Sequence, residues 1–290
     1  MKTNLYKLLN IFSKITFYKN NGLRVLAYHD LKDSSIFESH LKFLVNSSFN
    51  IIDINVLKNH LFKNEKLPPN SILITFDDGD VSVLDHGLPL LKKYNLPSVM
   101  FVITSLIGSV NTFWCRWVEI ALQNQGKSYT ESRLIVNKLK EISNTERVTY
   151  LKQLEPIDSR QLTKDDILMM QSEKMFIGNH THTHPMVDKC SSEELNDDLK
   201  LSKISFEKWQ LPGAEIFAYP NGNWDKTSED ILKNNGVKMA FLFDHKLNKT
   251  DLNPMRISRI RVNSDTELNE FKLKVSGLHS KLMTLKNRIV

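Results

Sequence analysis

The chain has 290 residues, of which 41% are hydrophobic and 25% charged, and its net charge is +6. This length can bury one large core or two ordinary ones, and the composition is that of a globular protein. The lysines are spread along the chain rather than gathered in a stripe, so we expect no nucleic-acid partner. With only two cysteines, Cys115 and Cys190, a disulfide framework and a cysteine-ligated zinc site are excluded.

The first segment, residues 1–21, has the pattern of an amphipathic helix, with apolar residues at helical spacing and lysines mostly between them. Lys7 and Lys14 interrupt any apolar core, so the segment is not a convincing signal peptide. No apolar run reaches the roughly 18 residues of a spanning helix. We therefore expect a cytoplasmic protein whose N-terminal helix docks on the domain, with peripheral membrane contact as the alternative.

Short apolar segments then alternate with helical patterns up to about residue 265. The expected strands are residues 23–29, 50–54, 71–76, 98–104, 174–178, 215–220, 238–243 and 256–262. This alternation, with strands that are mostly apolar, predicts an α/β fold with a parallel sheet covered by helices. Eight strand candidates favour a closed or distorted (β/α) barrel, seven- or eight-stranded and TIM-barrel-like, over an open sheet.

Two segments depart from the alternation. Residues from about 107 to 165 are helical and charged, and we interpret them as an insertion after the fourth strand that lies over one rim of the barrel. Residues 266–290 are expected to form a C-terminal helical tail. The barrel itself is therefore predicted to span residues 22–265, including the insertion.

Asp77 and Asp78 are adjacent carboxylates that directly follow the third expected strand, and Gly79 comes next. Two neighbouring anions repel each other, so the pair is costly unless a cation, a proton or solvent relieves it. Taken alone, such a pair is more often a solvated turn or a helix cap.

Three histidines, His180, His182 and His184, occupy alternate positions after the fifth expected strand. The carboxyl ends of barrel strands share one rim, so we expect these histidines to meet the two aspartates there. Two neutral imidazoles and one carboxylate suit zinc or a similar divalent ion, which activates water and polarises a carbonyl oxygen. A nearby carboxylate that is not a ligand can take the proton from that water. Together these features favour a metal site.

These residues resemble the motifs of the polysaccharide deacetylase family, carbohydrate esterase family four. Residues 75–79 read T-F-D-D-G, residues 180–185 fit H-[ST]-x-x-H-P, and residues 217–222, FAYPNG, resemble the third motif. The stretch VLAYHDL, residues 25–31, is similar to the opening of the exopolysaccharide de-N-acetylase branch. The resemblance implies a distorted (β/α) barrel and metal-dependent removal of N-acetyl, less often O-acetyl, groups from sugars.

The resemblance also implies roles for individual residues. Asp77 is expected to be the catalytic base, and Asp78, His180 and His184 are expected to be the metal ligands. The backbone N–H of Tyr219 is expected to help bind the oxyanion, as the tyrosine of the family's third motif does.

Two positions depart from the family pattern. The third motif lacks the usual arginine, and we expect Arg259 on the last strand to orient Asp77, with Arg256 as the alternative and surface salt bridging as the other interpretation of both. For the general acid, we prefer His29 on the first strand to His245, which belongs to the stretch LFDH.

Three tryptophans near the rim, Trp114, Trp117 and Trp224, are candidates to stack on sugar rings, although core packing is the favoured interpretation for the first two. His182 falls on a variable position of the second motif. We expect it to be solvated or to lie beside the metal ligands without binding the ion.

The sequence thus predicts a metal-dependent hydrolase, with zinc preferred, that removes N-acetyl groups from an amino sugar. The substrate partner is expected to be a polysaccharide, an oligosaccharide or a lipid-linked glycan precursor. One alternative is the same site acting on a non-sugar amide. Another is a non-catalytic carbohydrate-binding relative, which analysis of bound metal would distinguish from an enzyme.

Overall fold

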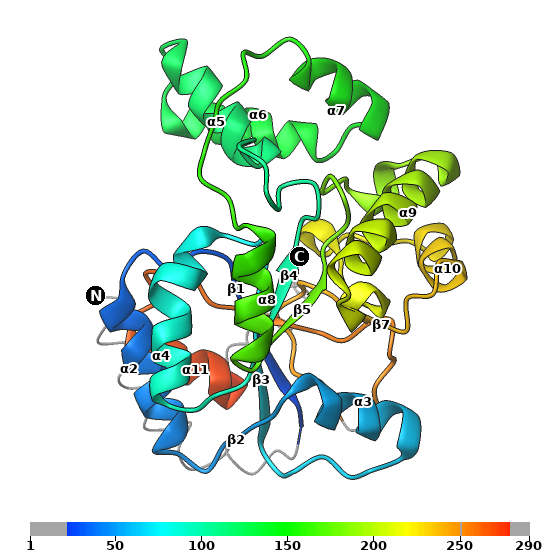
Figure 1. Ribbon diagram of the computed structural model, residues 1–290. Helices are drawn as coiled ribbons and strands as arrows, with labels where there is room; N and C mark the ends of the chain where they lie inside the picture. Colours follow the sequence, from blue (N-terminus) through cyan, green and yellow to red (C-terminus); the bar gives the residue numbers. More distant parts are fainter. Residues whose placement is uncertain (1–21, 250, 279–290) are drawn as a thin grey trace, which may run out of the picture.

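The computed structural model describes residues 22–249 and 251–278 (Figure 1). The predicted N-terminal helix and the part of the predicted C-terminal tail beyond residue 278 lie outside the described residues. Within the described ranges, no helix is both long enough and apolar enough to cross a membrane.

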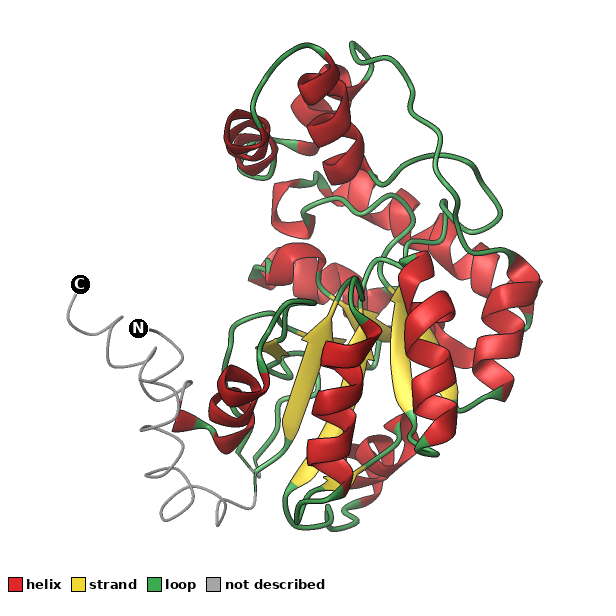
Figure 2. Ribbon diagram, turned by 90° about the vertical axis from the view of Figure 1, so that its left-hand side faces the viewer, coloured by secondary structure: helices red, strands yellow, loops and turns green. Residues whose placement is uncertain are grey.

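Eight parallel strands form one curled sheet (Figures 1 and 2). They are β1 (Arg24–Tyr28), β2 (Asn50–Ile51), β3 (Ser71–Phe76), β4 (Ser98–Val102), β5 (Met175–Asn179), β6 (Ile216–Ala218), β7 (Met239–Phe241) and β8 (Ile260–Arg261). The order is β7-β6-β5-β4-β3-β1-β8, and β2 pairs with the first residues of β3.

The segment that follows β7 closes the sheet. Pro254 accepts a hydrogen bond from the backbone of Ala240, and Ile257 forms a parallel bridge with Phe241. A few residues later the same segment becomes β8, where Ile260 is paired with β1. Because this segment touches both edges of the sheet in turn, the predicted distorted (β/α) barrel is confirmed.

Helices cover the outside of the barrel (Figure 2). The α-helices in this layer are α2 (Ser34–Val45), α4 (Leu88–Lys93), α8 (Lys164–Ser172), α9 (Ser192–Trp209), α10 (Lys226–Asn234) and α11 (Leu268–Ser276). Helix α3 (Ile54–Lys63) instead lies below the barrel in Figure 1 and packs Ile54 and Leu57 against the inner apolar cluster. A π-helical turn, η1 (Val83–Gly87), leads into α4, and 3₁₀ turns η2 (Val187–Lys189), η3 (Pro212–Glu215) and η4 (Pro220–Gly222) lie in connecting loops.

Residues from alternate positions of the strands build two apolar layers. Leu26 and Ile74 face the helices and pack in one cluster with Leu41 of α2. Their neighbours Val25 and Leu73 face the other way and pack with residues of the remaining strands inside the barrel. Both faces of these strands are therefore buried, which explains why their sequences are mostly apolar.

Between β4 and β5 the chain leaves the barrel and forms three helices, α5 (Trp114–Asn124), α6 (Tyr129–Leu139) and α7 (Asn144–Leu151). Figure 1 shows this group above the barrel, and its apolar side chains form a separate cluster that includes Val118, Leu122 and Val136. Capping boxes of serine and glutamate begin both α6 and α7. The group, called the helical insertion below, lies over the rim where β4 ends.

Candidate active site

The two adjacent aspartates lie at the carboxyl end of β3. The backbone N–H of Asp77 donates to the Tyr28 carbonyl oxygen at 3.0 Å, which extends the pairing with β1 by one residue. Asp78 and Gly79 then adopt left-handed backbone conformations, with φ of 67° and 74°. This region is unfavourable for a residue with a side chain, and such strain is concentrated at functional sites. The turn leaves both carboxylates at the rim.

Arg259 binds Asp77 through both arms of its guanidinium. The distances are 2.6 Å from Nη1 to Oδ1 and 2.7 Å from Nη2 to Oδ2, and both side chains are buried. Burial alone would raise the pKa of Asp77, but Arg259, together with the nearby histidines, holds that pKa below its ordinary value. Arg256 instead pairs with Glu229, at 2.6 Å. The structure thus brings Arg259, and not Arg256, to the predicted base.

His180 directly follows β5, and its ring is fixed by a backbone carbonyl. Its Nδ1 lies 2.8 Å from the Ala218 carbonyl oxygen, which can only accept, so Nδ1 carries the hydrogen. The lone pair of Nε2 therefore faces the other way, where Asp78 Oδ1 lies 3.3 Å from it. This is the tautomer that a histidine needs to bind a metal through Nε2.

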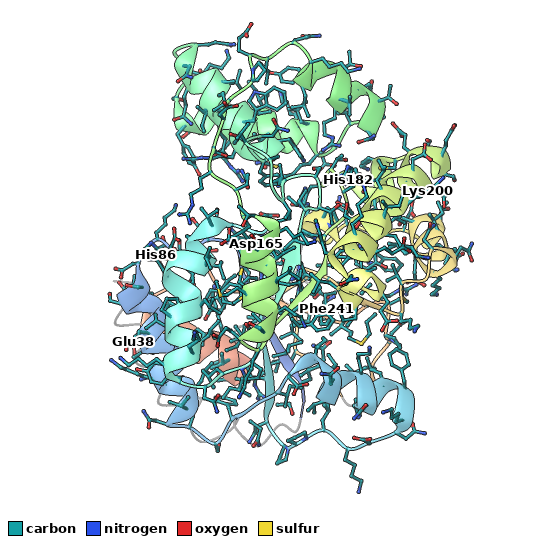
Figure 3. The ribbon with its side chains drawn as sticks, viewed as in Figure 1. Glu38, His86, Asp165, His182, Lys200 and Phe241 are labelled. Carbon is teal, nitrogen blue, oxygen red and sulfur yellow. The ribbon has the colours of Figure 1, made fainter. Side chains whose placement is uncertain are left out.

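The loop after His180 is held by Asp198 of α9. The carboxylate of Asp198 accepts hydrogen bonds from the backbone N–H groups of His182 and Thr183 and from the Thr183 hydroxyl, at 2.6–2.9 Å. His182 lies beside α9 (Figure 3), and its ring bonds to Thr104 Oγ1 at 2.8 Å. It is therefore directed away from the other two histidines. The contact from Asp198 was not predicted, because nothing in the pattern of α9 marks this position.

His184 returns to the rim and meets His180. The two rings are 4.7 Å apart between centroids, and His184 Nε2 lies 3.5 Å from Asp78 Oδ1. Burial and the proximity of His180 hold the pKa of His184 well below its ordinary value, so its imidazole is neutral at pH 7. His184 has a left-handed backbone, with φ of 57°.

Asp78, His180 and His184 together form a site that fits a divalent cation. One ligand atom from each residue lies within 4.8 Å of the other two. Asp78 Oδ1 is buried, and no hydrogen bond reaches it from the described residues. A buried carboxylate oxygen without a partner, facing two imidazole nitrogens, is costly unless a cation lies among them. The donor set of two histidines and one carboxylate is one that zinc accepts.

A cavity of about 400 Å³ opens over this cluster. His29 lines it, 40% exposed, with its Nε2 at 3.9 Å from Asp77 Oδ2 and its ring edge against Phe243. His245 is not among the lining residues, and its backbone N–H donates to the Arg259 carbonyl oxygen. The structure therefore places His29, rather than His245, beside the base and the cavity.

The expectation for Tyr219 needs a correction. Its backbone N–H donates to the Phe241 carbonyl oxygen at 3.0 Å, because β6 and β7 remain paired at this position. Its ring packs among Phe217 and Leu232 under the helices, and burial raises the pKa of its hydroxyl. Although Tyr219 is part of the cavity wall, the backbone donor predicted for the oxyanion is already used in this structure.

None of the three tryptophans lines this cavity. Trp114 and Trp117 donate their indole N–H groups to backbone carbonyls, and the Arg256 guanidinium lies 3.7 Å from the centre of the Trp224 ring. Besides Tyr219, two phenylalanines line the cavity, Phe113 and Phe243, and neither was predicted. No motif marks these two phenylalanines, and only the folded loops bring them to the rim.

Comparison with known proteins defines the class. Residues 64–240, more than half of the chain, match the family described as polysaccharide deacetylase. The chain therefore belongs to the polysaccharide deacetylase family, and it is a hydrolase that acts on carbon–nitrogen bonds other than peptide bonds.

Two relatives of known name are similar to the chain over most of its length. The chain is 25% identical, over 91% of its length and 86% of the relative, to a poly-β-1,6-N-acetyl-D-glucosamine N-deacetylase of Staphylococcus aureus. The enzyme of the same name from Staphylococcus epidermidis is 23% identical over 87% of this chain and 82% of the relative.

Two solved structures share the fold. Streptococcus pyogenes deacetylase PplD, in complex with acetate, superposes with a TM-score of 0.64 at 17% identity, covering 88% of this chain and 98% of that one. IcaB from Ammonifex degensii gives a TM-score of 0.63 at 19% identity, covering 89% and 98%.

Proposed function

We propose that the protein is a metal-dependent N-deacetylase that removes acetyl groups from N-acetylglucosamine units of a polysaccharide related to poly-β-1,6-N-acetyl-D-glucosamine. The observation that carries the metal dependence is the convergence of Asp78, His180 and His184 on one point at the rim. The substrate class follows from the relatives, which are named for that polymer and align with nearly the whole chain.

Asp78, His180 and His184 would hold the ion, and zinc is the ion that we propose. A divalent cation bound there supplies a Lewis acid for the acetyl carbonyl and lowers the pKa of water. The neutral His184 and the ionised Asp78 are already in the protonation states that ligands require.

Asp77 serves as the general base. It takes a proton from the attacking water as the water oxygen bonds to the acetyl carbon. The two hydrogen bonds from the Arg259 guanidinium fix the plane of this carboxylate and keep it ionised. The remaining lone pairs of the carboxylate oxygens stay free to accept the proton.

His29 serves as the general acid. As the carbon–nitrogen bond breaks, it gives a proton to the amine nitrogen, and acetate and the free amino sugar depart. Its Nε2 lies 3.9 Å from Asp77 Oδ2, so acid and base are close enough to act on the two sides of one small acetamido group. The phenyl rings of Phe113 and Phe243 offer apolar surface for a sugar ring or the acetyl methyl group.

The test is release of acetate from N-acetylated β-1,6-glucosamine oligosaccharides, with new free amines counted in parallel. We expect equal amounts of acetate and amine from the wild-type protein and a strong loss of both in Asp77→Asn. Acetate without new amine would show O-deacetylation instead. If the protein released no acetate from these oligosaccharides but released it from a simple non-sugar amide, the alternative that the site acts on a non-sugar amide would be favoured.

A further inference from the structure

The carbonyl oxygen of His184 receives two hydrogen bonds from the helical insertion. Trp114 of α5 donates from Nε1 at 3.0 Å, and Arg147 of α7 donates from Nη1 at 3.1 Å. Both donors are buried, with exposures of 5% and 2%. The ring of Phe113, which precedes α5, also meets the His184 ring edge-on at 4.8 Å. The insertion therefore contacts both the backbone and the side chain of this histidine.

His184 needs such support because of its backbone conformation. A φ of 57° is unfavourable for a residue other than glycine, and it persists only where the surroundings hold it. The N–H of His184 donates to Thr181 Oγ1 at 2.9 Å, so one end of the residue is fixed within its own loop. The other end, the carbonyl, is fixed by Trp114 and Arg147. If those two donors were lost, the loop would be free to relax and turn the imidazole away from Asp78.

Arg147 occupies a position that stability alone does not explain. Its guanidinium is buried, forms no ion pair within residues 22–249 and 251–278, and has an Nε without a partner there. Burying a cation without a carboxylate is costly. The guanidinium lies 4.8 Å from the centre of the Trp114 ring, and its Nη2 bonds to Asn144, which in turn bonds to Glu194 at the start of α9. The arginine thus links α9, α7 and the His184 loop.

We infer that Trp114 and Arg147 are positioning residues for His184, so that the helical insertion sets the metal affinity of the active site. Neither residue would bind the ion. They act by holding the backbone of one ligand in the left-handed conformation in which its Nε2 lies beside the other two ligands. This inference rests on the proposed metal-dependent function.

The insertion contains a matched control. Trp117 lies on the same helix as Trp114 and also donates its indole N–H to a backbone carbonyl, that of Glu155, at 2.7 Å. Replacing either tryptophan with phenylalanine removes one such bond and keeps an aromatic ring, but only Trp114→Phe releases His184. The measurement is zinc affinity of the full-length protein, by competition with a chromophoric chelator, with thermal melting as the check of folding.

Loss of a contact that orients a ligand typically weakens metal binding about 10–100-fold, and we expect Trp114→Phe and Arg147→Gln to fall in that range. Arg147→Lys, which can still donate to the carbonyl, should recover part of the affinity. Trp117→Phe should bind zinc as the wild type does.

Two results would count against the inference in different ways. If the wild-type protein binds zinc and the folded Trp114→Phe and Arg147→Gln proteins bind it equally well, the positioning role is wrong and the proposed function stands. If the wild-type protein binds no zinc, or if Asp78→Ala binds zinc as tightly as the wild type, the proposed function fails, and the positioning role fails with it.

Discussion

Replacing Arg259 with methionine would show how strongly the base depends on its buried partner. The guanidinium is fully buried and makes hydrogen bonds of 2.6 and 2.7 Å to Asp77, which is itself 2% exposed. Methionine fills much of the same volume without a charge. The substitution therefore leaves the Asp77 carboxylate buried and without the cation that balances it.

Removing one partner of a buried ion pair costs about 3–5 kcal/mol, so the free energy of unfolding should fall by about that amount at pH 7. The loss should also depend on pH. In the wild type, Arg259 holds the pKa of Asp77 below its ordinary value, and without it burial is left to raise that pKa. The variant then gains stability relative to the wild type as the pH falls and the carboxyl takes up a proton.

Urea unfolding followed by circular dichroism at pH 7 and pH 5 measures both effects. Adding Asp77→Asn to Arg259→Met should recover most of the lost stability, because no buried charge remains. Arg256→Met is the control, with an expected loss of about 1 kcal/mol or less, since Glu229 keeps its contact with Lys233. An Arg259→Met protein as stable as the wild type, or a double variant no better than the single one, would refute this reasoning.

Asp78→Ala should lose metal and activity together, whereas Asp77→Asn should keep the metal and lose turnover by about 10²–10⁴-fold; equal metal loss would contradict the assigned roles. His29→Ala should keep the metal and lose amide hydrolysis but still hydrolyse an activated ester, and His245→Ala should have nearly the wild-type activity. The reverse pattern would show that His245, and not His29, is the general acid. Burial lowers the pKa of His40 to about 4, so its neutral form stabilises the fold above pH 6.5 and this contribution is lost as the pH falls. Between pH 7 and 5 the wild type should therefore lose about 2 kcal/mol more unfolding free energy than His40→Gln, and equal losses would show that His40 does not titrate this way.

The barrel was predictable because most of its strand residues are buried and the strands are therefore mostly apolar. The lengths of the strands were harder to predict. The strand expected at residues 50–54 ends at Ile51, because the side chain of Asp53 accepts hydrogen bonds from Asn55 and Val56 and begins α3 at Ile54. The last strand, expected at residues 256–262, is reduced to Ile260–Arg261, because its first part crosses from β7 to β1.

The residues of the site were predictable where position along a strand decides them. Asp78 and His180 follow strand ends, and Arg259 directly precedes β8, the strand beside β1, so the barrel order brings them to one rim. Contacts that depend on side-chain packing or strand pairing were not predictable. Whether the Tyr219 N–H is free depends on how far β6 stays paired with β7, and Trp114 reaches His184 from 70 residues away.

The most direct test of metal-dependent deacetylation is acetate release from N-acetylated β-1,6-glucosamine oligosaccharides by protein stripped of metal with a chelator, before and after zinc is added. Activity should be absent from the stripped protein and should return with zinc in the wild type, but not in Asp78→Ala. Acetate release at the wild-type rate by the stripped protein, or by metal-free Asp78→Ala, would contradict the account.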